Sequence, residues 1–397
     1  MINPSANGWI DKFFLERQNS TPDNPDFEMF YKNVRSTGFI YGHIIGFNTQ
    51  VPIDSSQWLH DEISKAALLN ILYQAFCLNG ETNSKIFITK AVSFYHHMNP
   101  QGFNIFRKVL PGHSASSTLE KIIDERVQTN DNIISKNFSH VVTNALLFVD
   151  VLAFQQYLIH GIVPDKYLKK IEETIISIVT LALKTKINKS QHDDLLIKLF
   201  EASVRYSKFS KVNIQNLEAL QLDVYTNILE KYYFIDIAGL SIWSDGKVEN
   251  NEAYFLHTLA QTMNVSDNFV SDSIHETNYF ITTYKKEIPY FNYANPVKHF
   301  YDQTTQLVVT LINRNKKRLI KEISQSKELM VLLAHSTTRD LDKAEKKKVK
   351  KQLLDVCKSI PSLAIFLIPG GSLLLPILIK FIPQLLPSSF NENLEEE

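Results

Sequence analysis

The sequence is poor in cysteine, glycine and proline for its length. Two cysteines among 397 residues, Cys77 and Cys357, cannot form a disulfide framework, and lone thiols fit a reducing compartment. The 12 glycines and 14 prolines are too few for an all-β fold rich in turns. The N-terminus also lacks a basic stretch followed by an apolar one, which argues against a cleaved secretory signal. We therefore expect an all-α protein whose bulk faces the cytoplasm.

An excess of charge of either sign is also missing. Lys+Arg and Asp+Glu both total 42, so the formal net charge is zero. General nucleic-acid binding depends on a basic surface that neutralises phosphates, so DNA is not an expected partner. The sequence has no P-loop, dinucleotide fingerprint or zinc pattern. We assign no catalytic residues and expect that the protein is not an enzyme.

Helical periodicity covers most of the first 243 residues and predicts an N-terminal helical bundle over residues 1–220. The proline-containing stretches 18–35 and 42–58 are expected to be rich in loops. Asp150 and two glutamines favour a buried bundle helix over a membrane span at 138–160. Ser117 and Glu120 form a capping-box pattern at a helix start, and Pro164 is expected in the first turn of another helix. The remaining predicted helices cover 60–78, 84–97, 190–206 and 216–243.

A helical module with an acidic turn is predicted over residues 221–290, followed by connecting helices over 291–338. The residues that define this pattern are Ala238, Asp245-Gly246-Lys247-Val248, Glu252, Leu259 and Val265. On these residues the segment resembles the TerB-like helical domains. The resemblance implies that Asp245 and Glu252 bind Ca²⁺ or another divalent cation through carboxylate oxygens. The alternative is structural: Asp245 shapes the turn, and Glu252 supports the N-terminus of a helix. No other cofactor is expected.

The C-terminal region, residues 339–397, begins with a strongly basic amphipathic helix. Residues 339–358 contain eight basic and four acidic residues, and Val349, Leu353, Val356 and Ile360 share one side. A lysine cluster next to an apolar segment is attracted to anionic surfaces. The predicted basic surface consists of Lys346, Lys347, Lys348, Lys350 and Lys351.

An apolar segment punctuated by prolines follows this basic helix. Ser359–Ile379 is 21 residues long and has no formal charge, which is sufficient for one helical span across a core of about 30 Å. Pro369-Gly370-Gly371 could also divide it into a re-entrant or interfacial hairpin, and both arrangements remain open. Because the lysine cluster precedes the segment, the bulk of the chain is expected on the cytoplasmic side of a bacterial inner membrane. The membrane-segment residues are Pro361, Pro369, Gly370, Gly371, Ser372, Pro376, Lys380, Pro383 and Pro387.

The last 55 residues or so carry a second resemblance. The motifs are Leu341-Asp342-Lys343-Ala344-Glu345, Ile360-Pro361-Ser362, Phe366-Leu367-Ile368-Pro369, Leu373-Leu374-Leu375-Pro376, Lys380-Phe381-Ile382-Pro383 and Leu385-Leu386-Pro387-Ser388-Ser389-Phe390. They resemble the leucine-zipper and EF-hand transmembrane (LETM) family, and the whole chain is similar to bacterial LETM-related proteins of the biofilm-associated type. The resemblance implies an inner-membrane location, cation/proton exchange (K⁺/H⁺ or Ca²⁺/H⁺) and ribosome binding.

One departure from the LETM pattern affects the expected function. Ser372 stands where the family has an acidic residue inside the membrane segment, and an intramembrane carboxylate is the expected carrier of a proton or cation. We therefore expect first a membrane-tethered helical scaffold or interaction protein. Cation homeostasis and ribosome binding at the membrane are the two alternatives. The expected partners are membrane lipid, a ribosome or membrane protein, and a second copy of the chain.

Overall fold

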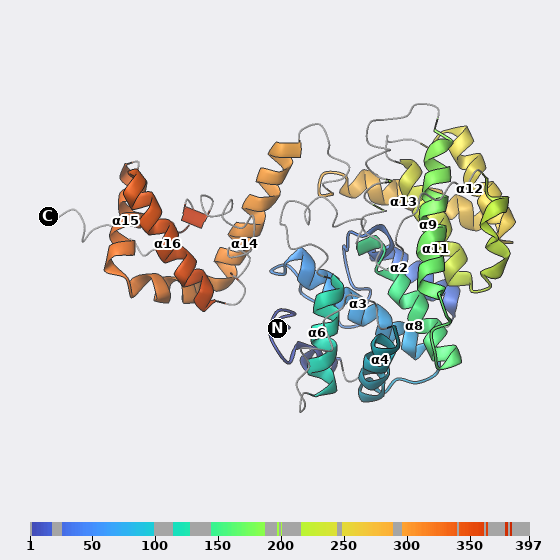
Figure 1. Ribbon diagram of the computed structural model, residues 1–397, viewed down its shortest axis with the longest axis horizontal. Helices are drawn as coiled ribbons and strands as arrows, with labels where there is room; N and C mark the ends of the chain where they lie inside the picture. Colours follow the sequence, from blue (N-terminus) through green and yellow to red (C-terminus); the bar gives the residue numbers. More distant parts are fainter. Residues whose placement is uncertain are drawn as a thin grey trace. The chain divides into compact units, whose positions relative to one another are not determined.

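A computed structural model describes residues 2–17, 26–98, 114–127, 144–186, 216–243, 248–288, 296–339 and 341–360, and the single residues 197, 200, 363, 378, 379 and 382. Side chains are not described at 296–307, 337 and 338. Every regular element in this part of the chain is a helix, so the all-α prediction is confirmed (Figure 1).

The chain divides into two compact units. The N-terminal unit comprises Met1–Asp54, His60–Thr129 and Phe138–Asn292, and the C-terminal unit comprises Ser55–Leu59, Asn130–Asn137 and Tyr293–Glu397. The helices of segment 221–290 belong to the same compact unit as the helices that precede them. The finer division into four domains stays a prediction.

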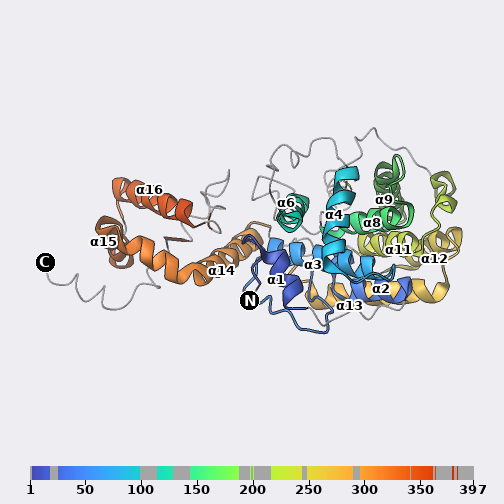
Figure 2. The same ribbon diagram turned by 90° about the horizontal axis from the view of Figure 1, so that it is seen from below.

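The N-terminal unit is built around two helices, α3 and α11, that are buried on nearly all sides. α3 contacts α4, α6 and α8, while α11 contacts α2, α9, α12 and α13 (Figure 2). Each helix has buried residues on most of its circumference, polar ones included, and therefore lies inside the bundle. The helical elements are α1 (Trp9–Leu15), α2 (Phe27–Ser36), η1 (Phe39–Tyr41), α3 (His60–Cys77), α4 (Ser84–Met98), α6 (Ala115–Val127), α8 (Phe148–His160), α9 (Tyr167–Lys184), η2 (Glu218–Leu220), η3 (Leu222–Val224), α11 (Ile228–Ile242), α12 (Asn250–Thr262) and α13 (Asp267–Tyr284).

Two fully buried carboxylates join helices inside this unit. Asp236 of α11 accepts hydrogen bonds from Tyr31 Oη at 2.7 Å and from Ser273 Oγ, and Arg35 Nη1 lies 3.5 Å from it. Asp150 of α8 has a similar environment: it accepts from the Arg126 guanidinium and from Tyr95 Oη. Because a buried charge requires a partner, these pairs fix how the helices meet.

Most of the predicted helices occur, and several predicted boundaries are wrong. α3 and α4 match the predicted helices. α8 is a buried bundle helix as expected, but it begins only at Phe148, after a turn at Leu146 and Leu147, whereas the helix was predicted over 138–160, of which 138–143 lie outside the described residues. The stretch predicted as loop over 18–35 contains α2, whose N-cap Asp26 accepts a hydrogen bond from Met29 N. The helix predicted over 216–243 is interrupted by two 3₁₀ turns, and α11 begins only at Ile228, after the N-cap Asn227. The helix predicted over 190–206 lies outside the described residues, apart from 197 and 200.

Two predicted helix starts in this unit are also wrong. α6 begins at Ala115, so Ser117 lies inside the helix, and Ser114 Oγ accepts from Ser117 N. Glu120 instead accepts hydrogen bonds from Gly8 N and Ile10 N, a contact with a distant part of the chain. α9 begins at Tyr167, three residues after Pro164, with Lys166 as its N-cap.

The C-terminal unit is formed by α14 (Pro296–Ser324), α15 (Lys327–Thr338) and α16 (Lys343–Ser359) around one apolar core (Figure 1). α14 supplies a buried row from Val308 to Ile323, α15 supplies Leu329 and Leu333, and α16 supplies Val349 and Leu353. This core also contains four described residues that lie in or next to the predicted apolar segment: Ile360, Leu363, Leu378 and Ile382.

The predicted membrane segment lies almost wholly outside the described residues, including every residue assigned to it above. Within the described part of the chain, no helix combines the length and the low charge that a transmembrane span requires.

Candidate functional site

The lysine-rich helix α16 begins at a well-defined cap. The Asp342 carboxylate accepts from Glu345 N at 2.8 Å, and Glu345 Oε2 accepts from Asp342 N at 2.9 Å. This reciprocal capping box satisfies two backbone donors at the helix start. The predicted apolar row is confirmed: Val349, Leu353 and Ile360 are buried, and Val356 packs against the core as a partly buried residue.

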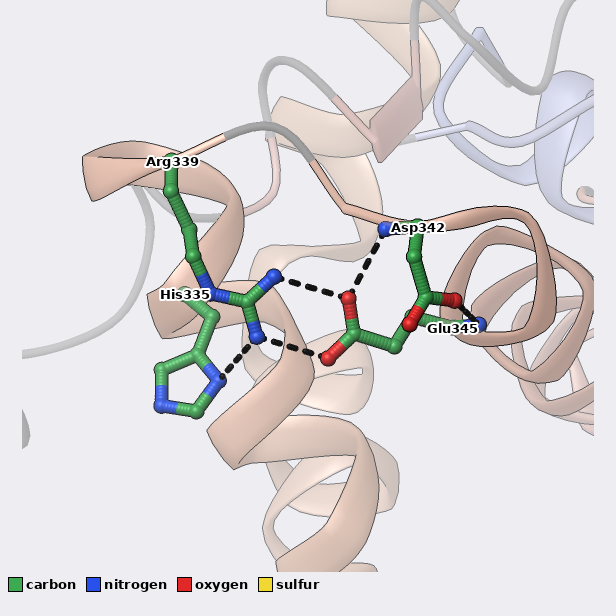
Figure 3. A network of polar contacts seen from close by, with 4 residues as sticks. All are labelled: His335, Arg339, Asp342 and Glu345. Carbon is green, nitrogen blue, oxygen red and sulfur yellow. Dashed lines mark hydrogen bonds and ion pairs between the residues drawn. The ribbon is translucent and has the colours of Figure 1, made fainter.

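Glu345 also joins the beginning of α16 to the end of α15. Arg339, which follows α15, donates from Nη1 and Nη2 to the two carboxylate oxygens of Glu345 at 2.8 and 2.7 Å. Arg339 Nη2 also lies 3.3 Å from His335 Nδ1 (Figure 3). The hydrogen bonds from Arg339, followed by that from the Asp342 backbone, lower the pKa of Glu345 to about 2. The bidentate geometry restricts the orientation of one helix on the other.

A second polar clamp connects the opposite end of α15 to the middle of α16. Glu328 accepts from Lys348 Nζ at 2.8 Å and from Gln352 Nε2 at 2.6 Å. Ser326, the N-cap of α15, donates to Gln352 Oε1 at 2.9 Å. Because the start of α15 meets the middle of α16 and its end meets the start of α16, the two helices form an antiparallel pair.

The five predicted surface lysines do not have equivalent environments. All five are exposed, yet Lys348 is paired with Glu328, and this contact lowers the pKa of Glu328 and raises that of Lys348. Lys346, Lys347 and Lys350 have no carboxylate partner among the described residues. Lys343, Lys347, Lys350, Lys351 and Lys358 recur at spacings that place them on one side of the helix, away from the buried row.

We call Lys347, Lys350 and Lys351 the α16 lysine face. Its side chains project from a helix that the core and two clamps hold in place, so the three positive charges lie on one side of that helix. A cluster of exposed lysines of this kind attracts phosphates and other anionic groups.

Part of the positive charge of this unit lies outside the lysine cluster predicted from the sequence. Residues 308–360 contain fourteen Lys and Arg and six Asp and Glu, a formal charge of +8 in a chain whose total is zero. Five of these basic residues fall in 314–321 of α14, where no acid occurs. A charge count in a sliding window, instead of one restricted to the residues before the apolar segment, would have found them.

The structure describes only one of the two candidate cation ligands. Asp245 lies outside the described residues. Glu252 is buried in the first turn of α12, where its carboxylate accepts from Glu249 N at 2.7 Å within a second capping box. This is the structural role given above as the alternative. No group of three or more His, Cys, Asp or Glu suited to a metal occurs in the part of the chain that is described.

Residues 341–397 match the family model described as "LETM1-like, RBD", in which RBD stands for ribosome-binding domain. No curated protein and no solved structure matches the chain. The match begins at Leu341, immediately before the capping box of α16, and covers 57 of 397 residues. A LETM1-like relationship is therefore confirmed for this segment. Bacterial origin, the biofilm-associated type and the TerB-like module stay predictions.

Proposed function

We propose that the C-terminal unit binds the ribosome through the α16 lysine face, and that the chain is a membrane-tethered interaction protein without enzymatic activity. The observation that carries the proposal is the position of this face within the segment that matches a ribosome-binding domain. The ribosome surface is rich in phosphate, and the lysines are exposed on a helix held in a defined orientation. Binding of this kind is electrostatic and weakens as salt displaces it.

Co-sedimentation of the full chain with purified ribosomes tests this proposal. The variant Lys347→Gln/Lys350→Gln/Lys351→Gln removes three charges, while glutamine retains a good helix propensity. The matched control, Lys85→Gln/Lys90→Gln/Lys285→Gln, removes three exposed lysines of the N-terminal unit. At about 0.1 M salt we expect the α16 variant to bind at least about tenfold more weakly and the control to bind like wild type. Equal binding by all three proteins would reject the proposal.

Membrane tethering by residues 359–390 is supported by the sequence of this segment. Ser359–Ile379 has no formal charge and directly follows the basic helix, an order that suits a cytoplasmic domain anchored in an inner membrane. The alternative is that this apolar segment packs inside the protein, because Ile360, Leu363, Leu378 and Ile382 are buried in the core of the C-terminal unit. Ser372 supplies no intramembrane carboxylate, so tethering is proposed here in place of cation exchange.

Membrane fractionation with carbonate and high-salt washes distinguishes these two uses. We expect full-length protein to remain in the washed membrane and a chain truncated after Lys358 to be released. Release of both proteins would show that the segment packs within the protein. A truncated chain that does not fold would leave the full-length result to decide alone: release of that protein by carbonate contradicts tethering.

A further inference from the structure

The outer side of α14 carries a basic stripe of its own. Lys317, Arg318 and Lys321 are exposed, and Arg314, one turn earlier on the same side, is half-buried. Their spacing of i, i+3, i+4 and i+7 places them together on one side of the helix. The buried row of α14 occupies the other side and comprises Val308, Leu311, Ile312, Leu319 and Ile323. We call Lys317, Arg318 and Lys321 the α14 basic face.

We propose that the α14 basic face binds the phosphate backbone of ribosomal RNA. The proposal rests on the proposed binding of this unit to the ribosome. It adds that a second surface, the α14 basic face, contacts the ribosomal RNA. α14 lies outside the segment that matches the family model, so the match assigns nothing to it.

The α14 and α16 faces are separate surfaces of one compact unit. α14 and α16 each bury their apolar row in the same core, and each presents its lysines on the side opposite that row. The two helices also contact each other directly. An anionic polymer that binds along this unit can therefore contact positive charge on both helices. The contributions of the two faces to the logarithm of the affinity should be roughly additive.

The composition of the α14 face favours RNA over a lipid surface. The residues that share its exposed side, Asn313, Ser324 and Gln325, are polar. A helix that lies on a membrane buries Leu, Phe or Trp below its charged rim, whereas the apolar row of α14 is already used in the protein core. The guanidinium of Arg318 suits phosphate oxygens and exposed bases, which both occur on folded RNA. Within the described residues, Lys317, Arg318 and Lys321 have no carboxylate partner.

Binding of the full chain to three probes tests the inference: protein-free ribosomal RNA, intact ribosomes and phosphatidylglycerol vesicles. The variants are Lys317→Gln/Arg318→Gln/Lys321→Gln, the α16 triple variant and the N-terminal control described above. We expect the α14 variant to bind ribosomal RNA at least about tenfold more weakly than the control at 0.1 M salt. The variant Lys317→Arg/Lys321→Arg keeps the positive charge, so it should bind ribosomal RNA like wild type. An unchanged helical circular dichroism spectrum shows that each variant is folded. If the α14 triple variant does not fold, the single variants Lys317→Gln and Lys321→Gln are measured in its place.

The outcomes separate this inference from the proposed function. Wild-type affinity of the α14 variant for ribosomal RNA overturns the inference, and ribosome binding that depends on the α16 face alone would then leave the proposed function standing. Loss of vesicle binding with retained RNA binding also overturns it, in favour of a membrane surface. RNA binding that requires the α14 face, in a chain that does not bind intact ribosomes, supports the inference and contradicts the proposed function.

Discussion

At the scale of single residues, Glu345 has an unusual concentration of hydrogen-bond donors for a surface carboxylate. It accepts from both terminal nitrogens of Arg339 and from the backbone of Asp342. The pKa of Glu345 falls from 4.5 to about 2 as a result. Because the folded pKa lies below the unfolded one, this contact contributes to stability above about pH 4.5 and loses that contribution as the pH falls towards 2. The Arg339–Glu345 pair should therefore stay charged throughout the neutral range.

The titration of Glu345 is the first prediction. Carboxyl ¹³C chemical shifts of the wild-type chain should show a midpoint near 2 for this residue. Substitution Arg339→Gln removes the first cause of the shift, so the midpoint should move up towards 4.5. A wild-type midpoint near 4.5 would mean that the Arg339–Glu345 pair is not formed in solution.

The buried pair of Arg35 and Asp236 gives the second prediction. Asp236→Asn removes the buried carboxylate next to Arg35, a residue that is 5% exposed. Breaking such a pair costs about 3–5 kcal/mol in the free energy of unfolding. Hydrogen exchange of α11 peptides across a urea series measures this loss. The exposed Asp272→Asn on α13 is the control and should change stability by less than about 0.5 kcal/mol. A small effect of Asp236→Asn would show that Arg35 finds another partner.

At the scale of elements, the sequence predicts α16 well and its partners poorly. The alternation of lysines with Val349 and Leu353 is a local pattern, and it defines both the helix and its buried side. The pairing of Lys348 with Glu328 could not be predicted, because it depends on how α15 packs 20 residues earlier in the chain. Glu120 shows the same limit: its capping-box spacing is local, whereas its carboxylate bonds to a segment 110 residues away.

The unequal surroundings of the α16 lysines give the third prediction. Lys348 and Glu328 neutralise each other, so the double variant Glu328→Gln/Lys348→Gln keeps the net charge and should bind ribosomes within about twofold of wild type. Lys347→Gln, one residue away, removes an uncompensated charge and should weaken binding about fivefold to tenfold at 0.1 M salt. Dissociation constants from co-sedimentation decide between them. Equal losses in both variants would indicate that the charge-neutral clamp itself contacts the ribosome.

At the scale of the whole molecule, positive charge is concentrated in one of the two compact units. The formal charge of +8 over residues 308–360 is balanced by an excess of acids elsewhere, so the net charge of the chain conceals it. This is why composition alone argued against a nucleic-acid partner, whereas the structure displays two basic faces on a shared core. The all-α fold followed from composition and periodicity. The distribution of paired and unpaired lysines required the packing of α14, α15 and α16.

The salt dependence of ribosome binding measures how many phosphate contacts the α16 lysine face makes. The observed association constant of the full chain is measured from about 0.05 to 0.3 M salt for wild type, for the α16 triple variant and for the N-terminal control. If Lys347, Lys350 and Lys351 each contact a phosphate, the slope of log association constant against log salt should become shallower by roughly 2–3 in the α16 variant only. A slope and affinity identical to those of wild type would contradict the account, because the α16 lysine face would then make no contact with the ribosome.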